Sequence, residues 1–283
     1  MTSRRADLAL LLATAIWGIG FPVVKSALAD ATPLALLTIR FGAATLLLLP
    51  FVPLRPRPGG RELAGGLLLG GLVAVGFITQ TVGLVITTPA RSAFIVAISS
   101  VIAPIVALVA FRQRPHVLVA AALALAGLGM YLLTAPDAGG LNRGDVWTLG
   151  CAVAFGAQIV LVGELSRRHD GRRLLLAQFA GTAASAALAL PLFERPAVHW
   201  TPGLAVALAY LVLGATVATF ALQLQAQQRM STARAALIFC AEPVFAALAS
   251  WLLAGERLSA AQWTGGALIL GAMLIAELPI RAS

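Results

Sequence analysis

Residues 90–95 read Ala-Arg-Ser-Ala-Phe-Ile, and residues 233–238, 143 positions later, read Ala-Arg-Ala-Ala-Leu-Ile. Three more positions match at this spacing: Ala74, Phe77 and Gln80 with Val217, Phe220 and Gln223. Other anchors match at spacings of 138 or 139: Asp7 and Trp17-Gly18 with Asp145 and Phe155-Gly156, and Pro104 with Pro243. The matches keep their order along the chain, so the second half repeats the first.

The composition is that of an integral membrane protein. Hydrophobic residues make up 60% of the 283 residues, charged residues only 11%, and the mean hydropathy is +0.93, which leaves too little polar surface for a soluble domain. A membrane-spanning helix needs about 20 apolar residues, and ten windows qualify: 8–28, 33–53, 63–86, 91–111, 116–135, 145–165, 174–194, 203–226, 233–254 and 260–279. We therefore expect an all-α membrane protein with ten transmembrane helices and no room for a soluble domain.

Each repeat holds five of these spans, in residues 1–140 and 141–283. Because five is odd, the second repeat enters the bilayer from the opposite side. The sequence therefore predicts two inverted five-helix repeats, the plan of many secondary transporters.

The formal charge of +9 does not indicate nucleic-acid binding, because the basic residues are scattered among loops. Their placement indicates the topology instead. With the N-terminus inside, fourteen Lys and Arg residues fall on the cytoplasmic side, five on the other, and Arg40 within a span. This positive-inside bias predicts a multi-pass membrane protein with both termini in the cytoplasm.

Helices interrupted by Gly or Pro at matching positions of the two halves indicate the substrate site of such transporters. The candidate hinge or broken-helix residues are Gly18, Pro22, Pro104, Gly156 and Pro243. Spans 3 and 8 add uncharged polar clusters. We expect a cavity among spans 1, 3, 4, 6, 8 and 9.

Four uncharged side chains are candidates for its wall. Trp17 and Phe155 fall near the middle of their spans, although Trp usually occupies the membrane interface. Gln80 and Gln223 lie toward opposite membrane faces, as a twofold axis in the membrane plane requires. The two aromatic residues line a substrate chamber or, alternatively, pack between helices. The two glutamines bind substrate or gate the pathway or, alternatively, make interhelical hydrogen bonds.

Only two charges lie near mid-depth, Arg40 in span 2 and Glu242 in span 9. Each costs about 2.5–3.5 kcal/mol on insertion scales, so the sequence suggests that they pair with each other. Such a pair serves as a structural link, as a receptor for charged groups of a substrate, or as a proton relay through Glu242.

Catalytic and metal-binding patterns are missing from the sequence. His116, His169 and His199 have no metal-ligand spacing, and neither a G-x-x-x-x-G-K-[ST] loop nor a G-x-S-x-G motif occurs. We predict no enzyme activity, no catalytic residue, no cofactor and no metal.

Residues 15–25, Ala-Ile-Trp-Gly-Ile-Gly-Phe-Pro-Val-Val-Lys, resemble the first-span signature of EamA-type members of the drug/metabolite transporter superfamily. Arg40-Phe41, Glu242-Pro243 and Gly255-Glu256-Arg257-Leu258 also resemble that family, whereas Arg114-Pro115 departs from the Gly-Glu expected after span 4. The resemblance covers the whole chain and implies a ten-helix inner-membrane exporter of amino acids, other small metabolites or drug-like cations.

The sequence is compatible with three functions. Export of a zwitterion such as an amino acid, by alternating access, is favoured because Glu242 is the single mid-depth acid and Arg40 can neutralise it. A cation-drug exporter would need a more acidic chamber. A non-transporting membrane scaffold would not need matched prolines and mid-depth aromatic residues. The expected partners are a small-molecule substrate and membrane lipid, with no nucleic acid, and the chain is expected to act as a monomer.

Overall fold

The computed structural model describes residues 3–53, 55, 58–134, 142–254 and 259–276. The expected boundary at residues 140 and 141 lies outside this part of the chain, as does the motif Gly255-Glu256-Arg257-Leu258.

The described chain is helical, with a single isolated bridge between Ala31 and Val198 and no strand. The elements in chain order are α1 (Ser3–Ala27), α2 (Pro33–Leu48), η1 (Leu49–Phe51), α3 (Gly60–Ile86), α4 (Pro89–Ala97), α5 (Ser99–Phe111), α6 (Val117–Thr134), α7 (Arg143–Ser166), α8 (Gly171–Phe193), α9 (Pro202–Ala209), η2 (Tyr210–Ala218), α10 (Thr219–Gln227), α11 (Thr232–Phe239), α12 (Glu242–Ala254) and α13 (Ala260–Ala276).

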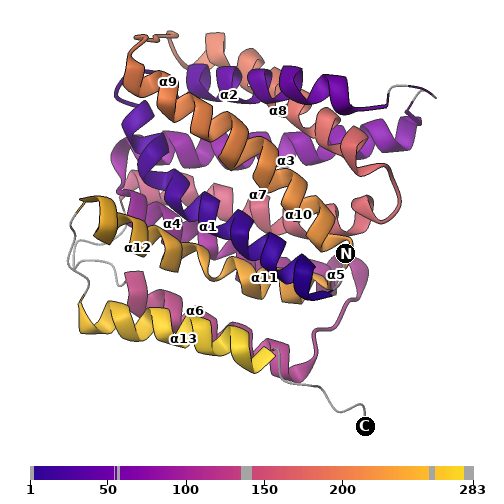
Figure 1. Cartoon of the computed structure of the whole chain (residues 1–283), viewed down its shortest axis with the longest axis vertical. Helices are drawn as coiled ribbons and strands as arrows, with labels where there is room; N and C mark the ends of the chain where they lie inside the picture. The colour runs from indigo at the N-terminus through magenta and orange to yellow at the C-terminus, as the bar shows by residue number, and fades with distance from the viewer. Residues whose placement is uncertain (1–2, 54, 56–57, 135–141, 255–258, 277–283) are drawn as a thin grey trace.

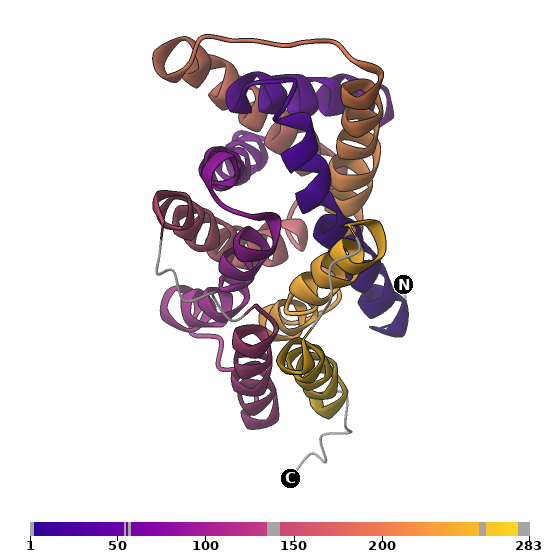
Figure 2. The same ribbon diagram turned by 90° about the vertical axis from the view of Figure 1, so that its left-hand side faces the viewer.

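These helices form one bundle. In Figure 1 they run across the picture, with α4 and α12 labelled on the left and α11 and α5 on the right. Figure 2 looks along the helices and shows α13 beside α6 at the lower edge. Large apolar side chains on the outside, such as Leu46, Val109 and Leu188, are 71%, 78% and 73% exposed, which suits a surface that faces lipid.

Eight helical segments of the described chain are long and apolar enough to cross a membrane. The fifth and tenth expected spans correspond to the shorter apolar helices α6 and α13, of 18 and 17 residues. At 1.5 Å per residue these two are about 26 Å long, slightly less than the roughly 30 Å hydrocarbon core.

Local sequence signals place the helix starts. Pro33, Pro89 and Pro202 each occupy the first turn of a helix, where their missing N–H is not needed. The carboxylate of Glu194 accepts hydrogen bonds from the N–H groups of Leu34 and Ala35 at 3.1 and 2.9 Å. This contact ties the start of α2 to the end of α8.

Three of the expected spans are divided. The fourth consists of α4 and α5, which meet at Ile98, and the ninth of α11 and α12, which meet at Cys240 and Ala241. The eighth contains a nine-residue π-helix, η2, between α9 and α10. Segments of π-helix are rare and frequently lie at functional sites.

Glycines allow α3 to pack closely on its neighbours. A Cβ on Gly70 would lie 2.7 Å from the carbonyl oxygen of Gln178 in α8, and one on Gly76 would clash with the ring of Phe155 in α7. Such contacts are typical of helix packing in membranes, and they hold α3 against both helices beside the central cavity.

Candidate functional site

A cavity with a volume of about 60 Å³ lies in the middle of the bundle. Its wall is contributed by α1, α2, α3, α4, α5, α7, η2, α10, α11 and α12. Spans from both halves of the chain therefore enclose one chamber, and α2 joins the six spans that the sequence indicated. Of the candidate residues, Trp17, Arg40, Phe155, Gln223 and Glu242 line it.

Aromatic rings form two walls of the cavity. The ring of Trp17 meets that of Phe220 edge to face, with centroids 5.4 Å apart and planes at 73°. Phe155 and Phe77 make the same arrangement at 5.2 Å and 73°. The Trp17 indole N–H donates to the carbonyl oxygen of Ala215 at 3.0 Å, so the polar group of this mid-depth tryptophan has a partner.

Arg40 is held by the π-helical segment. Its side chain is 2% exposed, and its Nε and Nη2 donate to the Thr216 hydroxyl at 2.7 Å and to the Ala215 carbonyl at 2.9 Å. The guanidinium carbon also lies 4.5 Å from the centroid of the Phe77 ring. Hydrogen bonds and the aromatic face thus stabilise this buried charge.

Arg40 and Glu242 do not form the direct ion pair that their shared depth suggested. No ion pair within 4.0 Å joins them among the described residues. The carbonyl and hydroxyl oxygens of η2 accept from Nη2 and Nε, so these two donors of Arg40 are satisfied without the Glu242 carboxylate. Both residues instead line the same cavity.

Glu242 is the first residue of α12 and is 9% exposed. Within the described chain, no hydrogen-bond donor pairs with its carboxylate. A carboxylate at the first turn of a helix is favoured by the helix dipole, and this one remains available to a positively charged group in the cavity.

The sequence did not single out Gln158, which also lines the cavity. Its side-chain amide exchanges hydrogen bonds with that of Gln223, at 3.1 and 3.4 Å. A signal was present, because Gln158 follows Phe155 by three residues and so lies on the same helix face. Gln80 is buried in α3 but is not part of the cavity wall.

The candidate hinge residues occupy different settings. The helix α1 continues through Gly18 and Pro22, and α7 continues through Gly156, so the chain is not broken at these positions. A Cβ on Gly18 would lie 2.7 Å from the Glu242 carbonyl oxygen, and its role here is close helix packing. Pro104 lies inside α5, and Pro243 in the first turn of α12.

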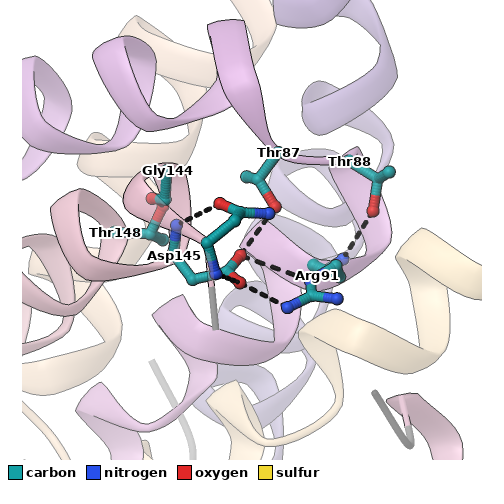
Figure 3. Close-up of polar contacts among 7 residues, drawn as sticks. Thr87, Thr88, Arg91, Gly144, Asp145 and Thr148 are labelled. Atoms are coloured by element: carbon teal, nitrogen blue, oxygen red, sulfur yellow. Dashed lines mark hydrogen bonds and ion pairs between the residues drawn. The ribbon is translucent and has the colours of Figure 1, made fainter. Parts of the chain in front are cut away.

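Two ion pairs that the sequence analysis left without a role join helices of opposite halves. Asp7 in α1 accepts from Nε and Nη2 of Arg234 in α11 at 2.9 and 2.8 Å. Asp145 in α7 pairs with Arg91 in α4 and accepts from the Thr87 hydroxyl at 2.7 Å (Figure 3). The signal for both lay in the matched spacings, which place the two acids and the two arginines at equivalent positions.

None of the described residues forms a group of three or more His, Cys, Asp and Glu side chains that could hold a metal ion. The two cysteines, Cys151 and Cys240, are buried and not bonded to each other.

Comparison with known proteins gives the family. The model of the EamA-like transporter family matches the chain twice, over residues 4–135 and 142–277. The chain belongs to the EamA-like transporter family. It is a multi-pass membrane protein of a family of transporters.

Relatives and a solved structure agree with this assignment. An uncharacterized transporter of Archaeoglobus fulgidus is 34% identical over 97% of this chain and 86% of its own length. The uncharacterized inner membrane transporter YicL of Salmonella typhimurium is 27% identical over 60% of this chain and 58% of its own length. A protein of known crystal structure superposes with a TM-score of 0.80 over 96% of both chains, at 20% identity, which establishes the fold alone.

Proposed function

We propose that this protein is a secondary transporter that exports a small zwitterionic metabolite, an amino acid or a similar compound, by alternating access. The observation that carries the proposal is the central cavity, into which Arg40 and Glu242 bring opposite charges without pairing. A zwitterion needs both an anion-binding and a cation-binding group. Arg40 would face its carboxylate and Glu242 its ammonium group.

The remaining cavity wall fits a small solute. The cavity volume of about 60 Å³ is room for a few waters. The aromatic rings of Trp17 and Phe155 offer apolar surface, and Gln158 and Gln223 offer amide groups. Mostly apolar pockets with a few converging polar groups are typical of small-molecule sites.

Matched contacts support the inverted repeat that alternating access requires. The aromatic pair Trp17–Phe220 has its counterpart in Phe155–Phe77, at the repeat spacings of 138 and 143 residues. The ion pairs Asp7–Arg234 and Asp145–Arg91 are related in the same way. The double match of the family model supports a division near residue 140.

Ten membrane spans, a bacterial inner-membrane location and cytoplasmic termini complete the proposal. The two short helices α6 and α13 would be the fifth and tenth spans, and the basic residues set the orientation. A single chain encloses the whole cavity, so a monomer suffices for transport.

Flux into proteoliposomes tests this function. The purified protein should carry one or more labelled amino acids, and Glu242→Gln should lower that flux at least tenfold while the protein stays folded. Saturable transport of cationic drugs alone would favour the drug exporter. Absence of flux across a broad panel of amino acids, metabolites and cations would favour the scaffold and overturn the proposal.

A further inference from the structure

The two ion pairs between the halves occupy equivalent positions in the repeat. Asp7 and Asp145 lie 138 residues apart, and Arg91 and Arg234 lie 143 apart. The helix starts that carry the arginines match as well. The Thr88 hydroxyl accepts from the backbone N–H of Arg91 at the start of α4, and the Ser231 hydroxyl accepts from that of Arg234 at the start of α11. Similar local geometry thus presents both arginines.

The pairs lie at opposite ends of the bundle. Asp7 is near the start of α1 and pairs with Arg234 near the start of α11, and the starts of these two helices lie toward the right of Figure 1. Arg91 is in the first turn of α4 and pairs with Asp145 near the start of α7 (Figure 3). The starts of these two helices lie toward the left of Figure 1. The central cavity lies between the two ends, since Trp17 and Phe155 line it from the middle of α1 and α7.

Each arginine is carried by a short half-helix. The helix α4 has nine residues and α11 has eight, and each meets the second half of its span beside the cavity. Val96 and Ser99 line the cavity at the first junction, and Phe239 and Glu242 line it at the second. Movement of either half-helix would therefore alter the cavity wall.

The second halves of these spans pack closely on α1 and α7 at two glycines. A Cβ on Gly18 of α1 would lie 2.7 Å from the Glu242 carbonyl oxygen and 2.8 Å from Phe245 Cβ in α12. A Cβ on its repeat equivalent, Gly156 of α7, would lie 2.5 Å from Cγ2 and 2.8 Å from Cβ of Ile102 in α5. The ion pairs join the far end of α11 to α1 and the far end of α4 to α7. Each half-helix can therefore pivot about its junction beside the cavity when its ion pair breaks.

From this arrangement we infer that Asp7–Arg234 and Asp145–Arg91 are the two gates of the pathway, one at each end of the cavity. Both gates are closed in this structure. Release of one ion pair lets its half-helix move away and opens the cavity to that side while the other stays shut. The inference rests on the proposed transport function and adds the residues that control access.

The two gates differ in strength. Asp145 has a fully buried side chain and accepts further hydrogen bonds from the Thr87 hydroxyl and the Asn142 N–H. The side chains of Asp7 and Arg234 are 20% and 30% exposed, and partly exposed pairs are weaker. The gate at the N-terminal end of α1 should therefore open more readily than the other.

Accessibility of a cavity cysteine tests the gates without any substrate. Ser99→Cys is placed in a background with both native cysteines changed to alanine, and an impermeant methanethiosulfonate reagent is applied to cells and to inside-out vesicles. Asp7→Asn should raise labelling from the side of the N-terminus about 5- to 30-fold, the effect of one or two kcal/mol. Asp145→Asn should raise labelling from the opposite side only.

Matched variants separate gating from general damage. Glu62→Gln removes the partner of Arg173 in an ion pair between α3 and α8, away from the half-helices, and should leave labelling unchanged. Exchange of the charges, Asp7→Arg with Arg234→Asp, should restore slow labelling. Where an aspartate variant fails to fold, Arg234→Gln and Arg91→Gln make the same predictions.

Increased labelling on the same side for both gate variants, or unchanged labelling for both, would overturn the inference. Amino-acid flux is measured in parallel. Side-specific labelling in a protein that carries no solute would retain the gates and reject the proposed function. Amino-acid flux without side-specific labelling would retain the proposed function and reject the gates.

Discussion

Replacement of Gly18 by alanine tests the contact that holds α1 against α12. The added Cβ would lie 2.7 Å from the Glu242 carbonyl oxygen, 2.8 Å from Phe245 Cβ and 2.9 Å from the Ala246 nitrogen. Two of these are backbone atoms, which cannot rotate away, so the helices must separate. Overpacking of this kind costs about 1–3 kcal/mol, whereas the higher helix propensity of alanine returns about 1 kcal/mol.

Gly20, two residues further along α1, is the matched control. A Cβ there has as its nearest neighbour Ala215 Cβ at 4.0 Å, so Gly20→Ala should gain the propensity term of about 1 kcal/mol without a clash. The free energies of unfolding of the two variants should therefore differ by about 1–3 kcal/mol, with Gly18→Ala the less stable. Because Gly20 lines the cavity, it is a control for stability only.

Thermal unfolding in one detergent, followed by loss of monodisperse protein, provides the comparison. Gly42→Ala adds a second control, since a Cβ at this position meets nothing within 4 Å. We expect the melting temperature of Gly18→Ala to fall below that of the parent and those of both controls to equal or exceed it. Equal melting temperatures for Gly18→Ala and Gly20→Ala would refute the close approach of α1 and α12.

Three further expectations concern the cavity and the topology. Trp17→Phe keeps the aromatic packing but removes the hydrogen bond to the Ala215 carbonyl, so thermal denaturation should show a loss of about 1 kcal/mol; an unchanged melting temperature would contradict that bond. Arg40→Lys keeps the charge but cannot reproduce the forked contacts, so flux of a zwitterion should fall, and unchanged flux would remove Arg40 from the site. A cysteine in place of Arg172 should react with an impermeant reagent only from the cytoplasmic side and one in place of Trp200 only from outside, and the reverse pattern would refute the orientation.

Helix positions were predictable because bilayer thickness restricts each span to about 20 apolar residues, whatever the neighbouring helices are. The positions at which a span breaks into two helices were harder to predict from the sequence, as the ninth span illustrates. Proline removes the hydrogen bond to the carbonyl four residues earlier. For Pro243 that residue is Phe239, where α11 ends. Pro22 has the same local effect, yet α1 continues through it, so packing decides between a break and a tolerated proline.

The environment of Arg40 shows why the site could be predicted only in part. Burial of the charge followed from its place in a span, and the need for a compensating group followed from the cost of burying it. The predicted partner of Arg40, Glu242, was wrong. The actual partners, the carbonyl of Ala215 and the hydroxyl of Thr216, come from a π-helical segment. No composition or spacing in residues 210–218 indicates that their backbone departs from an α-helix.

The duplication carries more information than any single motif, because it constrains contacts as well as positions. If Asp7 pairs with Arg234, an inverted twofold relation requires Asp145 to pair with Arg91, and the four residues are fixed by two repeat spacings. The departures from symmetry are then the informative features. Glu242 has Ser99 as its equivalent, and Arg40 in α2 is matched at a spacing of 138 by Gln178 in α8. Each mid-depth charge therefore occurs in one repeat alone. The proposed binding of an asymmetric solute predicts this asymmetry, whereas a symmetric scaffold does not.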